Sequence, residues 1–557
     1  MGDGARRDEI RWTADGRGVS RRGLLAALGL GTGAVVLGGC VVTAPAVHPP
    51  PPAGEHEGGP FPDGVKAGDP LPDGAVIWTR TTAPADGAPV PVVWSVAAAD
   101  GPLDGEAGWD ELVAGGVVLA DAAHGHTVSV RVDGLAPDRW YRYRFEVAPG
   151  ATSVAGAVSR AGRLRTAPAA GTAADHLRFA FCGDQQINDS WFVAHRAIAR
   201  EPGLDFFAHL GDYVYVHDVA TVTLDDYRGT YRRWHAQPML RDLHSALPIV
   251  ATWSDGEFYN GVDRTGPAER IAAAKQAWFE HFPVADDGSR RPERAFGWGS
   301  LADVVVLDDR THRDPTVGGV NRIDGDGLEV HDPTRTALGA EQYAWLTSTL
   351  QASTARWRIV AEDYPIAPWR LVNLEFLRPF RPDMPPGAGL YMPAEVWDQY
   401  MAQRADLLRS LADHGVADLL FCAAETHISL TSDLRAVPTD PSSPVLAADV
   451  TAPSLTADPD VRRAYLPDLP TEVADEVLHL AERWVLSQNA PDMRFMDLVH
   501  QGYVVVDADP ERIEVTYRFV DTADPDATAV DGARFRLVHG RPGLEVLPVA
   551  TPMGSLA

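Results

Sequence analysis

Six short apolar runs within residues 175–425 constrain the fold more than any other feature of the chain. They are "LRFAFC", "LDFFAHL", "LPIVATW", "ADVVVLD", "RWRIVAED" and "ADLLFCAA". Between them lie segments such as 266–281 and 394–414, whose apolar residues recur at three- and four-residue spacing and predict amphipathic helices. Strands that are apolar throughout are buried on both faces, with helices as the covering layers. We therefore expect residues 175–540 to form one α/β domain, ending in a hairpin around Asp509-Pro510.

Residues 61–168 show a different pattern, in which short runs alternate apolar and polar residues and are broken by turns. The runs are "AVIWTRTT", "PVVWSVAAA", "HTVSVRV", "WYRYRFEV" and "GRLRTAP". This pattern is typical of antiparallel strands. Tyr141, six residues after Leu135, resembles the tyrosine corner of fibronectin-type sandwiches. The segment is therefore predicted to be a β-sandwich, so the whole chain mixes α+β and α/β architecture.

The N-terminal residues 1–40 have the composition of a targeting segment. Arg21-Arg22 precedes an apolar run that ends in Leu37-Gly38-Gly39-Cys40. The paired arginines resemble a twin-arginine export signal read by a receptor, and LGGC resembles the lipobox of bacterial lipoproteins. A membrane anchor is the alternative, although the run is short beside the roughly 20 residues that a spanning helix needs. We expect export to the cell surface or beyond, with lipid on Cys40 as the membrane attachment.

Residues 41–60 are rich in Pro and Gly and predict an extended linker. The formal net charge of -28 disfavours nucleic acid or an anionic membrane surface as the main partner, because both would be repelled. The same excess of carboxylates suits bound cations. With Cys40 assigned to lipid, Cys182 and Cys422 remain, and each closes an apolar run. They are interpreted as buried thiols, with a disulfide between them as the alternative.

Four of the apolar runs end in groups that bind metals. Asp184 follows the first run, Asp212 the second and Asp255 the third, while Glu425 and His427 follow the sixth. Ligand sites in open α/β sheets form beyond the carboxyl ends of strands, so these side chains should converge. A single aspartate there is as readily explained by a helix cap or a turn. Four such ends together indicate bound cations, because converging carboxylates otherwise raise each other's pKa.

The kind of metal follows from the donor atoms. Carboxylate oxygens with one imidazole and one phenol suit Fe(III), Mn, Zn or Ca rather than a thiolate-bound metal. Two ions roughly 3.5 to 4 Å apart clamp the attacking and leaving oxygens of an in-line displacement at phosphorus. Asp212 is placed to bridge them, and Tyr215, about one turn later, is placed to return to one of them.

Six blocks of sequence resemble the alkaline phosphatase D (PhoD-like) family of the metallophosphoesterases. They are "FPDGVKAGDPLPDGAVIWTR" (61–80), "HLGDYVY" (209–215), "TWSDGEFYN" (252–260), "LDDRTHR" (307–313), "ETH" (425–427) and "TAPSLTA" (451–457). The resemblance implies a fibronectin-like sandwich before a double-sheet domain flanked by helices. It also implies hydrolysis of phosphate mono- or diesters by attack of a metal-bound hydroxide, with two or more ions. Fe(III) and Ca²⁺ are expected, with Zn or Mn as alternatives.

The resemblance also assigns residues to roles. Asp212 would bridge the ions, Tyr215 would ligate iron and Asp255 would bind the second ion. The expected metal ligands are Asp184, Asp212, Tyr215, Asp255, Glu425 and His427. Asp255 and Arg310 are the expected catalytic residues, and Asn260 and Arg310 the expected substrate contacts. For Arg310, a structural ion pair with Asp308 or Asp309 is the alternative to a bidentate contact with phosphate.

Three positions depart from the family pattern. Asp184 replaces the usual cysteine, Gly256 stands where a histidine is expected, and Glu425 replaces an aspartate. Metal binding is compatible with these changes, whereas rate and substrate preference are expected to differ. The alternative function is a cell-surface protein that keeps the metal site, has impaired catalysis and binds phosphorylated polymers. Gly256 is the feature that favours it.

Other residues near the predicted site have two interpretations each. Glu362 and Asp363 follow the fifth apolar run and are candidates for a further ligand, and His500 is a candidate for contact with the site. The Pro-rich segment 364–397 is either a lid or a surface loop. The remaining candidates are interpreted as structural histidines: His195, His217, His235, His244 and His281.

Overall fold

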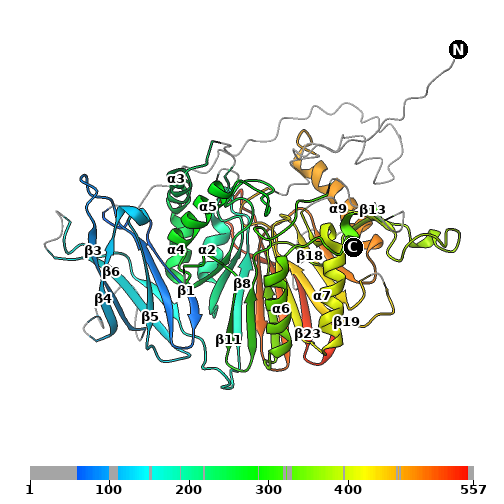
Figure 1. Cartoon of the computed structure of the whole chain (residues 1–557), viewed down its shortest axis with the longest axis horizontal. Helices are drawn as coiled ribbons and strands as arrows, with labels where there is room; N and C mark the ends of the chain where they lie inside the picture. The colour runs from blue at the N-terminus through cyan, green and yellow to red at the C-terminus, as the bar shows by residue number, and fades with distance from the viewer. Residues whose placement is uncertain are drawn as a thin grey trace, which may run out of the picture.

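The computed structural model describes residues 59–549 with short gaps, and Figure 1 shows the chain. The gaps are 100–108, 110, 150–153, 188–189, 217–219, 286–287, 318–320, 323–328, 393–394, 439, 459–461 and 463–465. The predicted signal segment with Cys40, residues 41–58 of the linker and His217 lie outside the described residues. Among the helices described, none combines the length and apolar character required to cross a membrane.

The larger sheet has ten strands in the order β24-β23-β22-β21-β8-β9-β10-β1-β2-β5. Their bounds are β1 (Val65–Leu71), β2 (Gly74–Arg80), β5 (Thr127–Asp133), β8 (Leu177–Cys182), β9 (Phe206–Leu210), β10 (Ile249–Thr252), β21 (Gln501–Ala508), β22 (Arg512–Val520), β23 (Val530–Val538) and β24 (Arg541–Leu547). The strands from β8 through β9 and β10 to β1 are parallel. The predicted C-terminal hairpin is confirmed as β21 and β22.

The second sheet has seven strands in the order β11-β12-β14-β17-β19-β18-β20. They are β11 (Arg294–Trp298), β12 (Ala302–Val306), β14 (Trp357–Ala361), β17 (Leu419–Ala423), β18 (Ser429–Arg435), β19 (Val445–Thr451) and β20 (Met493–Asp497). All six apolar runs are therefore strands, divided equally between the two sheets. One hydrophobic core joins residues of both sheets, such as Phe181 with Val304 and Leu420. The runs are apolar on both faces because one face packs against the opposite sheet and only the other against helices.

Helices cover the outer faces of the two sheets (Figure 1). Those beside the larger sheet are α2 (Val193–Arg200), α3 (Leu224–His235), α4 (Pro238–Ala246) and α5 (Ala268–His281). Those beside the second are α6 (Gly339–Ala352), α7 (Met401–Asp413) and α9 (Thr471–Gln488). The short 3-10 helices are η1 (Ala122–His124), η2 (Glu329–His331), η3 (Glu375–Leu377) and η4 (Trp397–Tyr400). The predicted helix 394–414 is thus the 3-10 helix η4 followed by α7, and the Asp398 carboxylate in η4 accepts the N–H of Trp369 at 2.8 Å.

A four-stranded sheet of the N-terminal segment packs against β1, β2 and β5. Its strands are β3 (Val90–Ala98), β4 (Leu112–Ala120), β6 (Trp140–Val147) and β7 (Gly162–Arg165), in the order β4-β3-β6-β7. The core between the layers includes Val65, Ile77, Tyr143 and Phe145. The expected tyrosine corner is confirmed, since the Tyr141 hydroxyl donates to the Ala136 carbonyl at 3.2 Å and accepts its N–H at 2.9 Å.

The opposite layer of this N-terminal segment belongs to the larger sheet, because β1 pairs with β10 at Gly68 and Ile249. The chain therefore has a β-rich N-terminal part followed by a double-sheet part, as the fold class predicted. A third, small sheet consists of β13 (Asn321–Arg322), β15 (Arg370–Asn373) and β16 (Gly389–Tyr391), and its strands β15 and β16 come from the Pro-rich segment.

Candidate metal centre

The acidic groups after the strands sit on unusual backbone. Asp184 has φ of +63°, Asp212 +54°, Glu425 +65° and His427 +54°. Non-glycine residues seldom adopt this left-handed region, and backbone of this kind gathers at functional sites. At each of these positions the chain turns sharply at the end of a strand and directs a side chain beyond the sheet edge. Strands β8, β9 and β17 thus deliver their polar groups to one place.

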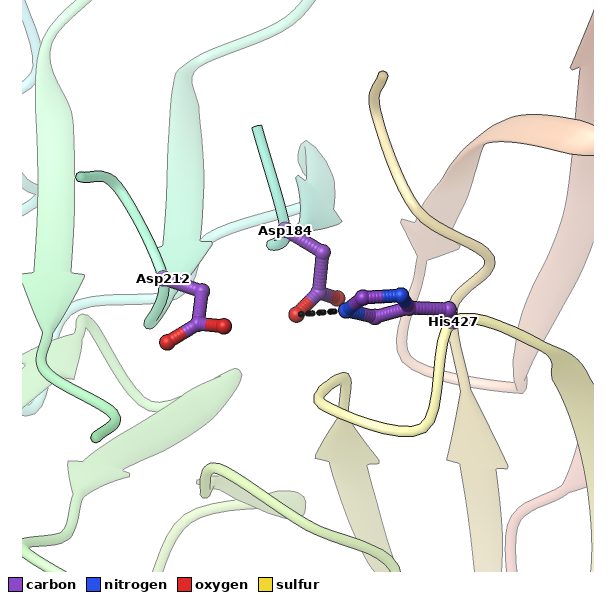
Figure 2. A group of neighbouring side chains, drawn as sticks. All are labelled: Asp184, Asp212 and His427. Carbon is purple, nitrogen blue, oxygen red and sulfur yellow. Dashed lines mark ion pairs between the residues drawn. The ribbon is translucent and has the colours of Figure 1, made fainter. Parts of the chain in front are cut away.

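The first group of side chains consists of Asp184, Asp212 and His427, with ligand atoms that lie within 4.8 Å of one another. Figure 2 shows the three pointing toward one another, with Nε2 of His427 3.4 Å from Oδ1 of Asp184. Nδ1 of His427 lies 3.0 Å from the carbonyl oxygen of Asp458. An N–H donated there leaves the lone pair of Nε2 facing the carboxylates, which is the tautomer that a metal ligand needs.

The second group consists of Asp212, Asp255 and Glu425, again within 4.8 Å. Asp212 belongs to both groups. The phenolic oxygen of Tyr215 lies 3.0 Å from Nε2 of His427, on the side of the first group. The structure therefore brings together the carboxylates, phenol and imidazole that the sequence placed at separate strand ends.

Glu257 holds the two loops that carry Asp212 and Asp255. Its carboxylate accepts the N–H groups of Asp212 at 3.1 Å, Tyr213 at 2.8 Å and Ser254 at 2.9 Å. Burial raises the pKa of Glu257 to about 7, against the lowering effect of these hydrogen bonds. Glu257 lies inside the block 252–260 but was not predicted as a site residue. A buried carboxylate that accepts backbone N–H groups has no characteristic spacing in the sequence.

The cluster carries more negative charge than its surroundings neutralise. Burial raises the pKa of Asp212 well above its ordinary value, and the charges of Glu425, Asp255 and Asp184 add to the effect. Burial likewise raises the pKa of Glu425 to about 8, although the charge of Arg310 opposes this. Cations bound among these oxygens would remove the repulsion. Oδ1 of Asp184 also accepts no hydrogen bond from the described residues, which leaves this oxygen available to a cation. The oxygen and nitrogen donors of the cluster fit hard or borderline metal ions.

Arg310 is completely buried and its guanidinium joins several acidic groups at the site. Nε donates to Asp363, and Nη1 donates to Glu395. Nη2 lies 2.5 Å from Oε1 of Glu425, and Nη1 lies 3.8 Å from Oδ2 of Asp255. The alternative of a side-chain ion pair with Asp308 or Asp309 is wrong, because only the backbone N–H of Arg310 contacts the Asp308 carboxylate, at 3.0 Å. The side chain instead faces the candidate ligands Asp255 and Glu425.

Two neighbours of Arg310 bear on the interpretations left open by the sequence. Asp363 accepts the Ser254 hydroxyl at 3.2 Å and lies beside the centre, whereas Glu362 accepts the indole N–H of Trp397 at 3.0 Å. Glu395 reaches Arg310 from the Pro-rich segment 364–397, so that segment contacts the centre. Glu395 was not predicted, and its Pro-rich surroundings carry no catalytic pattern.

The remaining candidates lie further from the cluster. Asn260 is exposed at the end of the loop that carries Asp255. His500 pairs with Asp497 through Nδ1 at 2.8 Å and stacks on Phe519, so its described contacts are not with the centre. Cys182 and Cys422 are buried free thiols, which confirms the thiol interpretation and excludes the disulfide.

Comparison with known proteins identifies the family. Residues 177–517 match the PhoD-like phosphatase family, and residues 46–168 match the N-terminal domain of PhoD-like phosphatases. The chain belongs to the PhoD-like phosphatase family. It is 28% identical to alkaline phosphatase D of Bacillus subtilis (strain 168) over 519 residues, which cover 86% of this chain and 81% of that protein. A solved structure described as that of PhoD matches with a TM-score of 0.74 and 28% identity, covering 89% of this chain and 93% of the other. PhoD-like phosphatases are metal-dependent phosphoester hydrolases, and in this member two groups of candidate metal ligands lie together.

Gly256 is the departure from the PhoD-like pattern that the structure explains best. Its N–H donates to Oδ1 of Asp212 at 2.8 Å. A Cβ on Gly256 would lie 2.6 Å from that same oxygen and 2.6 Å from the carbonyl of Val214. The backbone here approaches Asp212 so closely that a side chain requires the carboxylate to move.

Proposed function

We propose that the chain is an exported metal-dependent phosphoesterase that hydrolyses phosphate mono- or diesters. The observation that carries the proposal is that Asp212 belongs to both ligand groups, which is the arrangement of a carboxylate that bridges two ions. Membership of the PhoD-like phosphatases supports the same reaction. Bound ions in such a pair supply charge neutralisation at the phosphate and activation of a water molecule.

The donor atoms divide between two ions of different character. Asp184, Asp212, Tyr215 and His427 would hold Fe(III), because the phenol and imidazole stand together on that side. Asp212, Asp255 and Glu425 offer only carboxylate oxygens and would hold Ca²⁺, with Zn or Mn as alternatives.

Arg310 would bind and orient the phosphate. Its guanidinium is already among the site carboxylates, 3.8 Å from Asp255 and 2.5 Å from Glu425. When Glu425 turns to a cation, the Nη2 donor it held becomes available for a phosphate oxygen. Asp255 would act at the reacting phosphate through its place in the second group, and the exposed Asn260 would contact the substrate at the entrance.

Hydrolysis of p-nitrophenyl phosphate and bis(p-nitrophenyl) phosphate tests the proposal. The purified protein should release p-nitrophenol from one or both esters, lose the activity to a chelator and recover it with added metal. Asp212→Asn should abolish release, whereas Asp383→Asn, in an exposed pair with Arg381, should leave it unchanged. A purple or brown colour that disappears in Tyr215→Phe would support iron(III) held by the phenolate.

A second candidate function rests on Gly256. Because the residue opposite Asp212 has no side chain, the site lacks the proton donor or phosphate contact that the family histidine would offer. The protein would then hold its metals and bind phosphorylated polymers on the cell surface. Metal content and phosphate-polymer binding without release from either ester, across several metals, would favour this function over hydrolysis.

Export is proposed from the N-terminal residues. Arg21-Arg22 would direct the chain to the twin-arginine receptor, and Cys40 would carry lipid. Replacing both arginines with lysine should keep the protein in the cytoplasm, and Cys40→Ser should release an exported protein from the membrane fraction. Retention of export in the lysine variant would contradict the first assignment.

A further inference from the structure

A third group of metal-binding side chains lies on the edge of the second sheet, apart from the six ligands above. Glu293 directly precedes β11, and Asp308 and His312 lie in the turn after β12. Their ligand atoms lie within 4.8 Å of one another. Nε2 of His312 is 3.6 Å from Oδ2 of Asp308 and 3.9 Å from Oε1 of Glu293. The imidazole nitrogen is thus directed between two carboxylates but is too distant for a hydrogen bond with either.

Two of these atoms are buried without a hydrogen-bond partner among the described residues. They are Oε2 of Glu293 and Nε2 of His312. The Glu293 side chain is 9% exposed, and that of Asp308 is completely buried. Leaving a buried carboxylate oxygen and an imidazole nitrogen unsatisfied is unfavourable. A ligand that accepts electron pairs from both atoms would account for this arrangement.

Asp308 is already oriented by its other hydrogen bonds. Its Oδ1 accepts the N–H groups of Arg310 at 3.0 Å and Thr311 at 2.9 Å, together with the indole N–H of Trp253 at 2.9 Å. Its Oδ2 accepts the Thr311 hydroxyl and keeps a further lone pair on the side of His312. The carboxylate is therefore fixed in position, as carboxylates that ligate metal usually are.

Two basic side chains stand near the group but do not occupy it. Nη1 of Arg291 is 3.8 Å from Oε1 of Glu293, while its Nη2 donates to Glu341 at 3.1 Å. Nζ of Lys275 donates to the Thr311 hydroxyl at 2.9 Å. Neither donates a hydrogen bond to Glu293 or His312. Glu293 also lines a cavity of about 1050 Å³ between the N-terminal layers and the second sheet, so this one of the three side chains borders that cavity.

We propose that Glu293, Asp308 and His312 bind a divalent transition-metal ion of the Zn²⁺ class. Two carboxylate oxygens and one imidazole form a three-ligand set that leaves one position for water, a composition that suits Zn²⁺ and Mn²⁺ better than Ca²⁺. The site is separate from the centre built on Asp212. Because the same Asp308 carboxylate holds the backbone of Arg310, the ion would fix the turn that carries this arginine into the centre.

Metal counting on the full chain tests the site. The chelator-stripped protein is dialysed against Zn²⁺, and bound equivalents are measured by elemental analysis, with Co²⁺ absorption as a second readout of the ligand environment. His312→Gln and Glu293→Gln should each bind one equivalent fewer than the unaltered protein. His176→Gln is the matched control, since His176 is a half-exposed histidine paired with Asp507 at 2.7 Å, and it should lose nothing.

The centre and the new site are distinguished by a second pair of variants. The double variant Asp212→Asn, Asp255→Asn should lose the metal of the centre and keep one equivalent. Adding His312→Gln to this double variant should remove that remaining equivalent. Equal metal content in Glu293→Gln and the unaltered protein would overturn the proposal, as would the absence of Co²⁺ bands in the Asp212→Asn, Asp255→Asn protein. Circular dichroism shows whether each variant is folded. If His312→Gln is unfolded, the metal content of Glu293→Gln decides the result.

Discussion

Nζ of Lys66 lies 3.0 Å from Nε2 of His235, and both side chains are completely buried. The amine also donates to the carbonyl oxygen of His281 and lies 4.1 Å from the ring centroid of Trp78. Burial lowers the pKa of Lys66 well below its ordinary value of 10.5, although the charge of Asp63 opposes the shift. The layer between β1 and helices α3 and α5 therefore contains an amine that folding drives toward its neutral form.

Lys66→Met is expected to stabilise the protein. The unfolded chain protonates Lys66 below pH 10.5, whereas the folded protein resists protonation, so this residue lowers the free energy of unfolding as pH falls below 10.5. Methionine removes that cost and should raise the free energy of unfolding at pH 7 by about 1 to 2 kcal/mol. Thermal unfolding measured from pH 7 to 10 should show the gain shrinking as pH rises. A variant less stable at every pH would mean that the hydrogen bonds of the amine outweigh its desolvation.

The buried histidine His195 predicts a loss of stability in acid. Burial lowers the pKa of His195 to about 3, and Nε2 of this ring lies 2.7 Å from Oε1 of Gln185. Since the unfolded chain binds the proton from pH 6.5 downward and the folded protein does not until pH 3, stability falls across this window. The maximum slope is ~1.4 kcal/mol per pH unit for one such group.

His195→Gln should make the melting temperature less dependent on pH between 7 and 5 than it is in the unaltered protein. His176→Gln is the control, because that ring is half exposed and its pairing with Asp507 lies at the surface. Differential scanning calorimetry at both pH values gives the comparison. Parallel pH dependences for His195→Gln and the unaltered protein would show that His195 is not the source of the acid sensitivity.

The convergence of the metal-binding groups could be predicted from the sequence because it depends on two local patterns. A buried run followed by a carboxylate places that carboxylate at a strand end, and parallel strands share one edge. Asp184 and Asp212 are of this kind. Their neighbour Tyr215 was found in the same way, from its distance of three residues along the chain.

Other parts of the site depend on contacts that no local pattern encodes. Ser254 and Glu395 meet at Arg310 because two distant segments fold over the centre. Ser254 lies in the block 252–260, but neither that block nor the Pro-rich sequence around Glu395 indicates a contact with Arg310. The division of the apolar strands between two sheets was not evident from their composition, since a face covered by a second sheet is as apolar as one covered by helices. The resemblance to a family supplied that feature.

Gly256→Ala is expected to impair the centre, because a Cβ there meets both the Asp212 carboxylate and the backbone carbonyl of Val214. A Cβ at this position would lie 2.6 Å from Oδ1 of Asp212, so the carboxylate must shift. A displacement of about 1 Å at a reacting group can cost about 100-fold in rate. Hydrolysis of p-nitrophenyl phosphate and metal content should both fall. Gly229→Ala in α3 is the matched control, because nothing lies within 4 Å of a Cβ there, and it should keep full activity. Full activity in Gly256→Ala would show that Asp212 has room to move.

Glu395 would compete with the substrate phosphate for Arg310 if this arginine binds phosphate as proposed. Its carboxylate accepts Nη1 of Arg310 and, at 2.7 Å, Nη2 of Arg313. Burial raises the pKa of Glu395, but the charges of Arg313 and Arg310 outweigh it and bring the pKa down to about 2. The group is therefore ionised at neutral pH, and a phosphate bound to Arg310 as proposed would share the guanidinium with a full negative charge.

Glu395→Gln should consequently strengthen binding of inorganic phosphate. Removing the charge leaves the guanidinium of Arg310 less neutralised, so a phosphate oxygen gains a stronger donor. We expect the inhibition constant of phosphate to fall about tenfold, which corresponds to ~1.4 kcal/mol. Competitive inhibition of p-nitrophenyl phosphate hydrolysis measures it, with Asp383→Asn as the control in the same Pro-rich segment, where Arg381 and Asp383 pair in solvent. An inhibition constant that stays the same or rises would show that phosphate does not contact Arg310. If phosphate did contact the guanidinium, removing the negative charge of Glu395 beside it would strengthen the binding.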